Sequence, residues 1–373
     1  MNEEKLNEKL GLTQSAVDKE IEFADSIEKE VKFDFAKHIE DTTPSAVPQT
    51  STDIDEEPQR KAKKIDISKI SIIPKNAIEK EQDLRNALYG DKSVFQIVAA
   101  QSGYMAKVTS LVNKDVVNLL FSNLSRYEYR KSVFKVIYDK IVAFSVGRMT
   151  FEEWLKQTSV EDIETFYYGI YCATFPNSGS FTFTCPKCGN EETLKINHNN
   201  LFKTADKEKM KKLINDVSRN CNNISEMKKY SLIDKTEGFQ LTDSKIIMEL
   251  RTPSLWDSLE LLRTVPEQVI DRDTTSVTNM LYIKRFLIPT KTESGIDYSE
   301  QTDSQELLRI IDNLTIDDAN ELQTAVSDRV DENRISYTIK NIVCPKCQNE
   351  IKETAISIED ILFTLIFEKT GQY

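Results

Sequence analysis

Two copies of the tetrapeptide Cys-Pro-Lys-Cys constrain this chain more than any other feature of its 373 residues. They lie at Cys185–Cys188 and at Cys344–Cys347, and Asn-Glu follows each of them closely. The proline fixes φ at the first turn position, so both sulfurs of a turn can point towards one metal ion. Two such turns supply the four thiolates that a tetrahedral structural Zn²⁺ site takes from a protein. The sequence therefore predicts a structural Zn²⁺ ion with these ligands: Cys185, Cys188, Cys344 and Cys347.

Alternating apolar residues lie on both sides of each turn, and this alternation is typical of β-strands. Residues 180–184 lead into the first turn, and residues 335–339 lead into the second. We therefore expect each turn at the tip of a β-hairpin, and two facing hairpins make a zinc ribbon. Gly189 follows the first turn, whereas Gln348 follows the second. Because this position often adopts a left-handed conformation, we expect the glutamine to cost the second turn about 1 kcal/mol.

The first cysteines of the two turns are 159 residues apart (344 − 185). An ion shared across that distance would close a whole domain rather than a small finger, and whether both turns share one ion stays open. We predict that residues 200–333 form a long insertion with helices and one short hairpin, over these ranges: helices 204–230, 254–263, 276–288 and 303–333, and the hairpin 239–250. The predicted fold class is α+β, predominantly helical, with a four-cysteine zinc ribbon of two knuckle hairpins.

Charge and composition divide the chain into three regions. Residues 1–60 carry 16 Asp and Glu against 7 Lys and Arg, so 7 − 16 = −9 of the total net charge of −12 lies there. We predict an acidic N-terminal arm over residues 1–75, with an amphipathic helix and a flexible linker. A helical domain over residues 76–148 is predicted to follow, with one helix through residues 94–108. The zinc-ribbon domain with its insertion then takes residues 149–373.

Several classes of protein are disfavoured. No apolar run reaches the roughly 20 residues of a membrane span, and the acidic start is unlike a signal peptide, so we expect no membrane partner. His38 and His198 are the only histidines, and four thiolates would leave zinc no open position for water. Without a phosphate-binding loop or nucleophile motif as well, we predict that the chain is not an enzyme. A redox dithiol is a competing interpretation, but it needs a helix start that lowers one thiol pKa, and these cysteines lie between predicted strands.

The order of segments from Met149 to Leu262 is similar to that of a known family. An acidic, aromatic segment, TFEEWLKQTSVEDIETFYYGIYCATF, precedes FTFTCPKCGNEETLKINHNNLF, and FQLTDSKIIMELRTPSLWDSLEL follows. This order resembles the zinc-ribbon baseplate hub proteins of contractile-tail bacteriophages of the T-even type. The resemblance implies a structural subunit of the tail baseplate, without enzymatic activity, that contacts other phage baseplate and tail proteins.

On this interpretation the protein is assembled in the host cytoplasm, is located in the virion tail baseplate, and can self-associate in a symmetric ring. The alternative is a zinc-ribbon nucleic-acid-binding or polymerase-associated factor. That alternative predicts Lys, Arg and aromatic residues at the hairpin tips. The tips read PKCGNEE and PKCQNE, each with one Lys against Glu, and the net charge is −12. We therefore expect no nucleic-acid partner.

Overall fold

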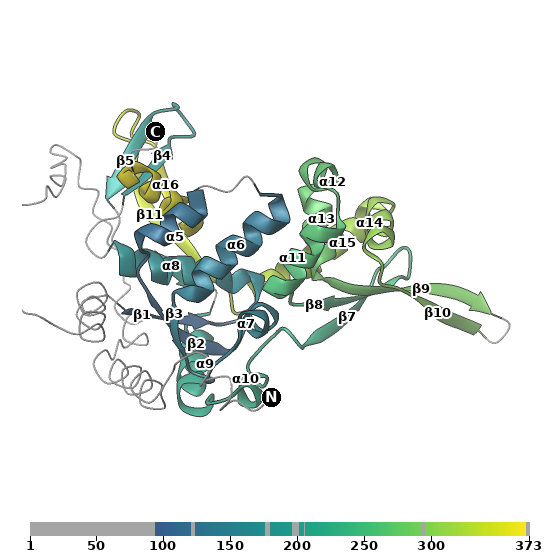
Figure 1. Cartoon of the computed structure of the whole chain (residues 1–373). Coiled ribbons are helices and arrows are strands. Elements are labelled where there is room, and N and C mark those ends of the chain that lie inside the picture. The colour runs from purple at the N-terminus through teal and green to yellow at the C-terminus, as the bar shows by residue number, and fades with distance from the viewer. Residues whose placement is uncertain are drawn as a thin grey trace, which may run out of the picture.

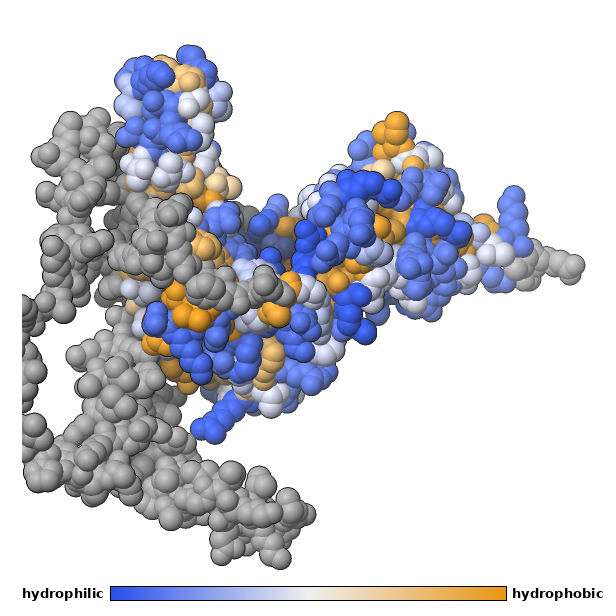
Figure 2. All heavy atoms as spheres, turned by 45° about the horizontal axis from the view of Figure 1, so that its top comes forward, coloured by the Kyte–Doolittle hydropathy of each residue, from blue (hydrophilic) through white to orange (hydrophobic). Residues whose placement is uncertain are grey.

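The computed structural model describes most of the chain after residue 93, namely residues 94–120, 124–175, 180–195, 201–204, 206–292 and 295–370. The predicted N-terminal arm over 1–75 lies outside the described residues, as do His38 and His198. Among the described residues, no helix is both long and apolar enough to cross a membrane. The face of the molecule in Figure 2 is mostly hydrophilic, with smaller hydrophobic areas between.

A small antiparallel sheet with helices packed against it forms the first part of the fold. Its strands lie in the order β1-β2-β3, and β1 and β2 form a hairpin. The elements of this part, which Figure 1 shows in blue to teal, are β1 (Val94–Ala99), β2 (Tyr104–Thr109), α5 (Asn113–Leu120), α6 (Arg126–Asp139), β3 (Ile141–Phe144), α7 (Phe151–Gln157), the 3-10 helix η2 (Val160–Asp162) and α8 (Ile163–Thr174). Trp154 lies fully buried in their shared apolar core, which we call the first core.

Helix α8 lies very close to the β1–β2 hairpin because it carries a glycine at the contact. A Cβ atom added to Gly169 would lie 2.5 Å from Ile97 Cγ2 and 2.7 Å from Val108 Cγ2. Glycine costs a helix interior about 1 kcal/mol relative to alanine, and here that cost permits the close packing of helix on sheet.

The insertion over residues 200–333 contributes to more than one apolar core. Its first elements are β6 (Phe202–Thr204), α9 (Lys207–Asn220) and α10 (Ile224–Met227). Helix α9 buries Met210, Ile214 and Val217 in the first core. The start of the insertion is therefore part of the same packed unit as the β1–β2–β3 sheet.

Most of the rest of the insertion forms a second core around a four-stranded antiparallel sheet in the order β10-β9-β8-β7. Its elements are β7 (Thr236–Gln240), β8 (Ile247–Arg251), α12 (Glu267–Arg272), α13 (Thr274–Tyr282), β9 (Ile283–Thr292), β10 (Gly295–Gln301), α14 (Ser304–Asp312) and α15 (Ile316–Asp331). Helix α11 (Leu255–Thr264) instead buries Leu255 and Leu259 in the first core. Phe286 is fully buried at the centre of this core. Figure 1 shows the β9–β10 hairpin projecting away from the rest of the molecule.

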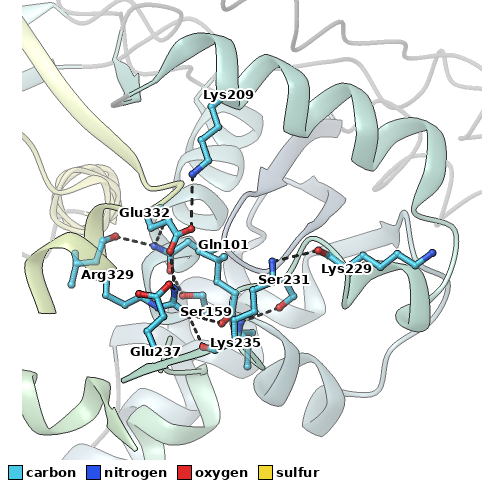
Figure 3. Close-up of polar contacts among 12 residues, drawn as sticks. Gln101, Ser159, Lys209, Lys229, Ser231, Lys235, Glu237, Arg329 and Glu332 are labelled. Carbon is cyan, nitrogen blue, oxygen red and sulfur yellow. Dashed lines mark hydrogen bonds and ion pairs between the residues drawn. The ribbon is translucent and has the colours of Figure 1, made fainter. Parts of the chain in front are cut away.

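Polar side chains link the end of α15 to the first core, as Figure 3 shows. The Gln101 side-chain amide donates to the carbonyl oxygens of Val330 and Glu332, both at 2.9 Å. The buried Arg329 guanidinium donates to the carbonyl oxygens of Leu232 at 3.1 Å and Lys235 at 2.6 Å. The bond from Arg329 to Leu232 is buried and the other three are partly buried, and each supplies a donor to a backbone carbonyl oxygen.

The predicted fold class was wrong in one respect, because the fold is not predominantly helical. Helices take 48% of the described residues and strands 27%, arranged in four sheets. The predicted helix over 94–108 is the β1–β2 hairpin, and the predicted helix over 276–288 ends at Tyr282, where β9 begins. Short apolar runs rich in β-branched residues suit a strand as well as a helix, so periodicity alone does not separate the two. Pro289 also disfavours a helix through the residues before it.

Two predicted elements of the insertion are confirmed, and the helix expected over 254–263 is α11. Thr150 and Ser254 are the N-caps of α7 and α11, and each forms a complete capping box. The predicted hairpin over 239–250 is the β7–β8 pair. Thr315 caps α15 by accepting a hydrogen bond from the backbone of Asp318 at 3.2 Å. These elements depend on local hydrogen bonds that the sequence shows directly.

Candidate metal centre

Both Cys-Pro-Lys-Cys turns lie at the tip of an antiparallel β-hairpin, as the sequence predicts. Four strands form the two hairpins: β4 (Ser180–Thr184) with β5 (Glu191–Lys195), and β11 (Ile335–Val343) with β12 (Glu350–Ala355). The last pair before the first turn is Thr184 with Glu191, and before the second turn it is Val343 with Glu350. Each turn therefore holds six residues, in equivalent register.

The backbone of the two turns is also equivalent. In the first turn, the N–H of Cys185 donates to the carbonyl oxygen of Asn190 at 2.8 Å, and the N–H of Gly189 donates to the carbonyl oxygen of Cys185 at 2.9 Å. The corresponding bonds of the second turn measure 3.0 and 2.9 Å. Two loops of equal length with equivalent backbone hydrogen bonds place their sulfur atoms in the same way.

The residue after the second cysteine of each turn has the left-handed conformation that the sequence predicts. The φ angle is +67° at Gly189 and +55° at Gln348. A left-handed conformation costs an L-residue roughly 1–2 kcal/mol, whereas glycine adopts it freely. The side-chain amide of Gln348 donates to the carbonyl oxygen of Pro345 at 3.2 Å, which ties the glutamine to its own turn.

The two turns face each other and bring the four cysteine sulfurs together. Cys185 Sγ lies 3.7 Å from Cys347 Sγ, and Cys188 Sγ lies 3.7 Å from Cys344 Sγ. All four sulfurs lie within 4.8 Å of one another. A tetrahedron of sulfurs about 2.3 Å from a central Zn²⁺ ion has edges of about 3.8 Å, whereas a disulfide measures about 2.05 Å. The spacing therefore fits ligands around one ion and does not fit disulfide bonds.

The first cysteine of each turn is buried and the second is half-buried. Cys185 is 1% exposed and Cys344 is 0% exposed, and both pack in a small apolar cluster with Phe183 and Ile342. Sequence reasoning did not single out this pair, although each lies two residues before the first cysteine of its turn. An apolar surround limits water at a metal site and so strengthens the bonds between thiolates and a cation.

The pKa values of two of the thiols, Cys185 and Cys347, move in opposite directions. Burial raises the pKa of the Cys185 thiol, but the N–H groups of Lys187 and Cys188 and the neighbouring thiols donate to it and lower the pKa to about 6 overall. Burial and hydrogen bonding with the other three sulfurs raise the pKa of Cys347 to about 12. Four thiolates this close repel one another, and a divalent cation between them removes that penalty.

The remaining two cysteines lie elsewhere. Cys172 is buried in α8, and burial raises its pKa to about 12. Cys221 ends α9, and burial raises its pKa to about 11. Within the described residues, the four turn cysteines are the one group of three or more His, Cys, Asp or Glu side chains whose ligand atoms lie close enough together to hold a metal ion.

Comparison with known proteins identifies a family. The family model described as the T4 bacteriophage base plate protein matches residues 131–362. This match takes 232 of the 373 residues (362 − 131 + 1) and includes both cysteine turns and the whole insertion. No curated protein and no solved structure matches the chain. The chain belongs to the family of T4 bacteriophage base plate proteins.

Proposed function

We propose that this protein is a structural subunit of the hub region of a contractile phage-tail baseplate, held in shape by one Zn²⁺ ion on four thiolates. The ligands are Cys185, Cys188, Cys344 and Cys347. The observation that carries the zinc proposal is the pair of 3.7 Å contacts between sulfurs of opposite turns. Thiolates in a tetrahedral S₄ set select zinc or iron, and zinc is the usual ion of such ribbons.

Family membership gives this chain a structural role in the phage baseplate, contacts with other tail and baseplate proteins, and a location in the virion tail. Its position in the hub is our proposal and rests on the order of segments around the first turn. Assembly in the host cytoplasm and self-association in a symmetric ring belong to the same proposal. We propose a role without catalysis at this site, because four thiolates would leave a zinc ion no open position for water or substrate.

The zinc ion would fix a hairpin that shares no strand pairing with the rest of the described structure. Among the described strands, β4 and β5 pair only with each other, and an isolated two-stranded hairpin is marginally stable in water. The second hairpin is firmly placed, because β11 continues into the first core, where Tyr337 is buried. One ion shared by the two hairpins would therefore fix the β4–β5 hairpin to the body of the protein.

The metal content of the purified full-length chain tests the site. We expect one zinc per chain, and we expect Cys344→Ser to remove most of it. Cys221→Ser is the matched control, because that cysteine is also buried but lies outside the site, and it should keep the zinc. Iron in place of zinc would refute the identity of the metal. Full zinc in Cys344→Ser would show that the two turns do not share an ion.

The assembly role needs a separate measurement. We expect the chain in purified virions, and we expect an affinity-tagged copy to recover other baseplate proteins from infected cells. Absence from virions together with recovery of no tail protein would contradict the hub proposal. Recovery of nucleic acid that is lost steeply with added salt would instead support the nucleic-acid alternative.

A further inference from the structure

A stretch of this acidic chain is basic. Residues 207–235, which include α9 and α10, contain 8 Lys and Arg and 4 Asp and Glu, a net charge of 8 − 4 = +4 in a chain of net charge −12. We call the basic residues of this stretch the basic face: Lys207, Lys209, Lys211, Lys212, Arg219, Lys228, Lys229 and Lys235. All of them are exposed except Lys211, which is half-buried.

The packing of α9 explains why this charge lies on the surface. Met210, Ile214 and Val217 pack in the first core, so the helical period of 3.6 residues puts Lys212 and Arg219 on the opposite side. The same helix also carries Glu208 and Asp216, which reduce the positive charge but do not cancel it. Over its whole length, α9 therefore carries five Lys and Arg against two Asp and Glu, a net charge of 5 − 2 = +3.

Much of this positive charge is not neutralised locally. Lys209, Lys211 and Lys228 have carboxylate partners nearby. Within the part of the chain that the structure describes, no carboxylate forms an ion pair with Lys212 or Arg219. In Figure 3 the side chain of Lys229 extends away from the labelled polar contacts. These cations are available to a negatively charged partner.

The chain itself supplies such a partner. Residues 1–60 have a net charge of −9, with 16 acidic side chains. The 33 residues from 61 to 93 separate them from β1, and a chain of that length spans at most about 110 Å, so reach is not limiting. A tethered segment has an effective concentration of the order of millimolar, so even weak attraction gives a populated contact.

We propose that the acidic residues 1–60 dock on the basic face of the same chain. Charge complementarity between +4 and −9 provides the attraction, and the covalent tether provides the concentration. The contact would hold the N-terminal region against α9 and α10, on the first core. It is independent of the zinc site, so it can fail without affecting the proposed function.

Carbodiimide cross-linking of the full-length chain, read by mass spectrometry, tests this contact, because the reagent joins only carboxylates and amines that touch. We expect links from residues 1–60 to Lys228 and Lys229, and we expect at least a fivefold loss of them in 1 M salt, where the screening length is about 3 Å. The test variant is Lys207→Gln with Lys212→Gln and Arg219→Gln, which keeps both reporter lysines. The control variant neutralises three other exposed lysines: Lys114→Gln, Lys291→Gln and Lys352→Gln.

The proposal requires the links to fall at least threefold in the test variant and to stay unchanged in the control. Links that survive 1 M salt, that fall equally in both variants, or that never form would overturn it. A mixture of ¹⁵N-labelled and unlabelled chains identifies the occupant. Links within a single isotope support docking in the same chain, whereas mixed-isotope links would show that the acidic segment occupies a second copy.

Discussion

Two glycines with the same backbone conformation should respond very differently to alanine. Gly103 lies in the β1–β2 turn with φ +76°, and Gly147 follows β3 with φ +84°. A Cβ atom at Gly103 would lie 2.6 Å from the backbone nitrogen of Ser231 and 2.9 Å from the carbonyl carbon of Tyr230. A Cβ atom at Gly147 would have no neighbour within 4 Å. Alanine at Gly147 therefore measures the cost of backbone strain alone, and alanine at Gly103 measures the same strain together with the loss of close packing.

The expected magnitudes follow from these contacts. In both variants the strain of a left-handed alanine lowers the free energy of unfolding by roughly 1–2 kcal/mol. Alanine also reduces the conformational entropy of the unfolded chain, and this offsets roughly 0.4–1 kcal/mol of the loss. Gly147→Ala should therefore lower the free energy of unfolding by about 1 kcal/mol. Gly103→Ala should add roughly 1–3 kcal/mol of overpacking, because the atoms that the new Cβ meets belong to the backbone and cannot rotate away. We expect a total loss of about 3 kcal/mol.

Thermal unfolding followed by tryptophan fluorescence measures the difference, because Trp154 is fully buried in the first core. One kcal/mol corresponds to a shift of roughly 2–4 °C in Tm for a domain of this size. Gly147→Ala should lower Tm by about 3 °C and Gly103→Ala by about 9 °C. Equal shifts would refute the close packing of the segment after α10 on the β1–β2 turn, and with it the assignment of the start of the insertion to the first core.

Three further predictions concern buried charge and the metal. Arg329→Met should lower the free energy of unfolding by about 3 kcal/mol in a urea titration, because Lys235 O loses the guanidinium donor, Leu232 O keeps only the N–H of Lys235, and Glu332 loses its ion pair; a loss below 1 kcal/mol would contradict this. Burial raises the pKa of Glu164 to about 7, so the folded state holds its proton more tightly than the unfolded state and stability should fall as pH rises from about 4.5 to 7. Glu164→Gln keeps an acceptor for the N–H of Ile358 and should flatten that slope, and an unchanged slope would exclude Glu164 as its source. Removing the metal with a chelator should release the β4–β5 hairpin to hydrogen exchange while the second core stays protected, and equal loss of protection in both regions would argue against a local role for the ion.

The sequence predicts the structure of each cysteine turn well because the signals for a single turn are local. A Cys-x-x-Cys turn, the strand alternation around it and the left-handed position after it are all visible within about twelve residues, and the structure confirms each of them at Gly189 and Gln348. The capping boxes at Thr150 and Ser254 are equally local, and both are present. Local signals of this kind predict structure reliably because here the local preference and the tertiary packing favour the same conformation.

The sequence does not predict how the insertion divides between two cores, nor which of several apolar stretches are strands. The helix expected over 94–108 and the one expected over 276–288 are apolar stretches whose conformation depends on distant partners. Strand β9 pairs with β8 and β10, and its apolar face is fixed by that pairing rather than by its own propensity. The cross-pairing of the sulfurs, 3.7 Å between Cys185 and Cys347, likewise depends on how the two hairpins face each other.

X-ray absorption spectroscopy at the zinc edge tests most directly whether the two Cys-Pro-Lys-Cys turns hold one ion. We predict a single shell of four sulfur atoms at about 2.3 Å, with one zinc per chain. Cys185→Ser and Cys347→Ser, which alter opposite turns, should each remove most of the zinc. A shell of two sulfurs with nitrogen or oxygen ligands, or two zinc ions per chain, would show that each turn binds its own ion and would contradict the shared site.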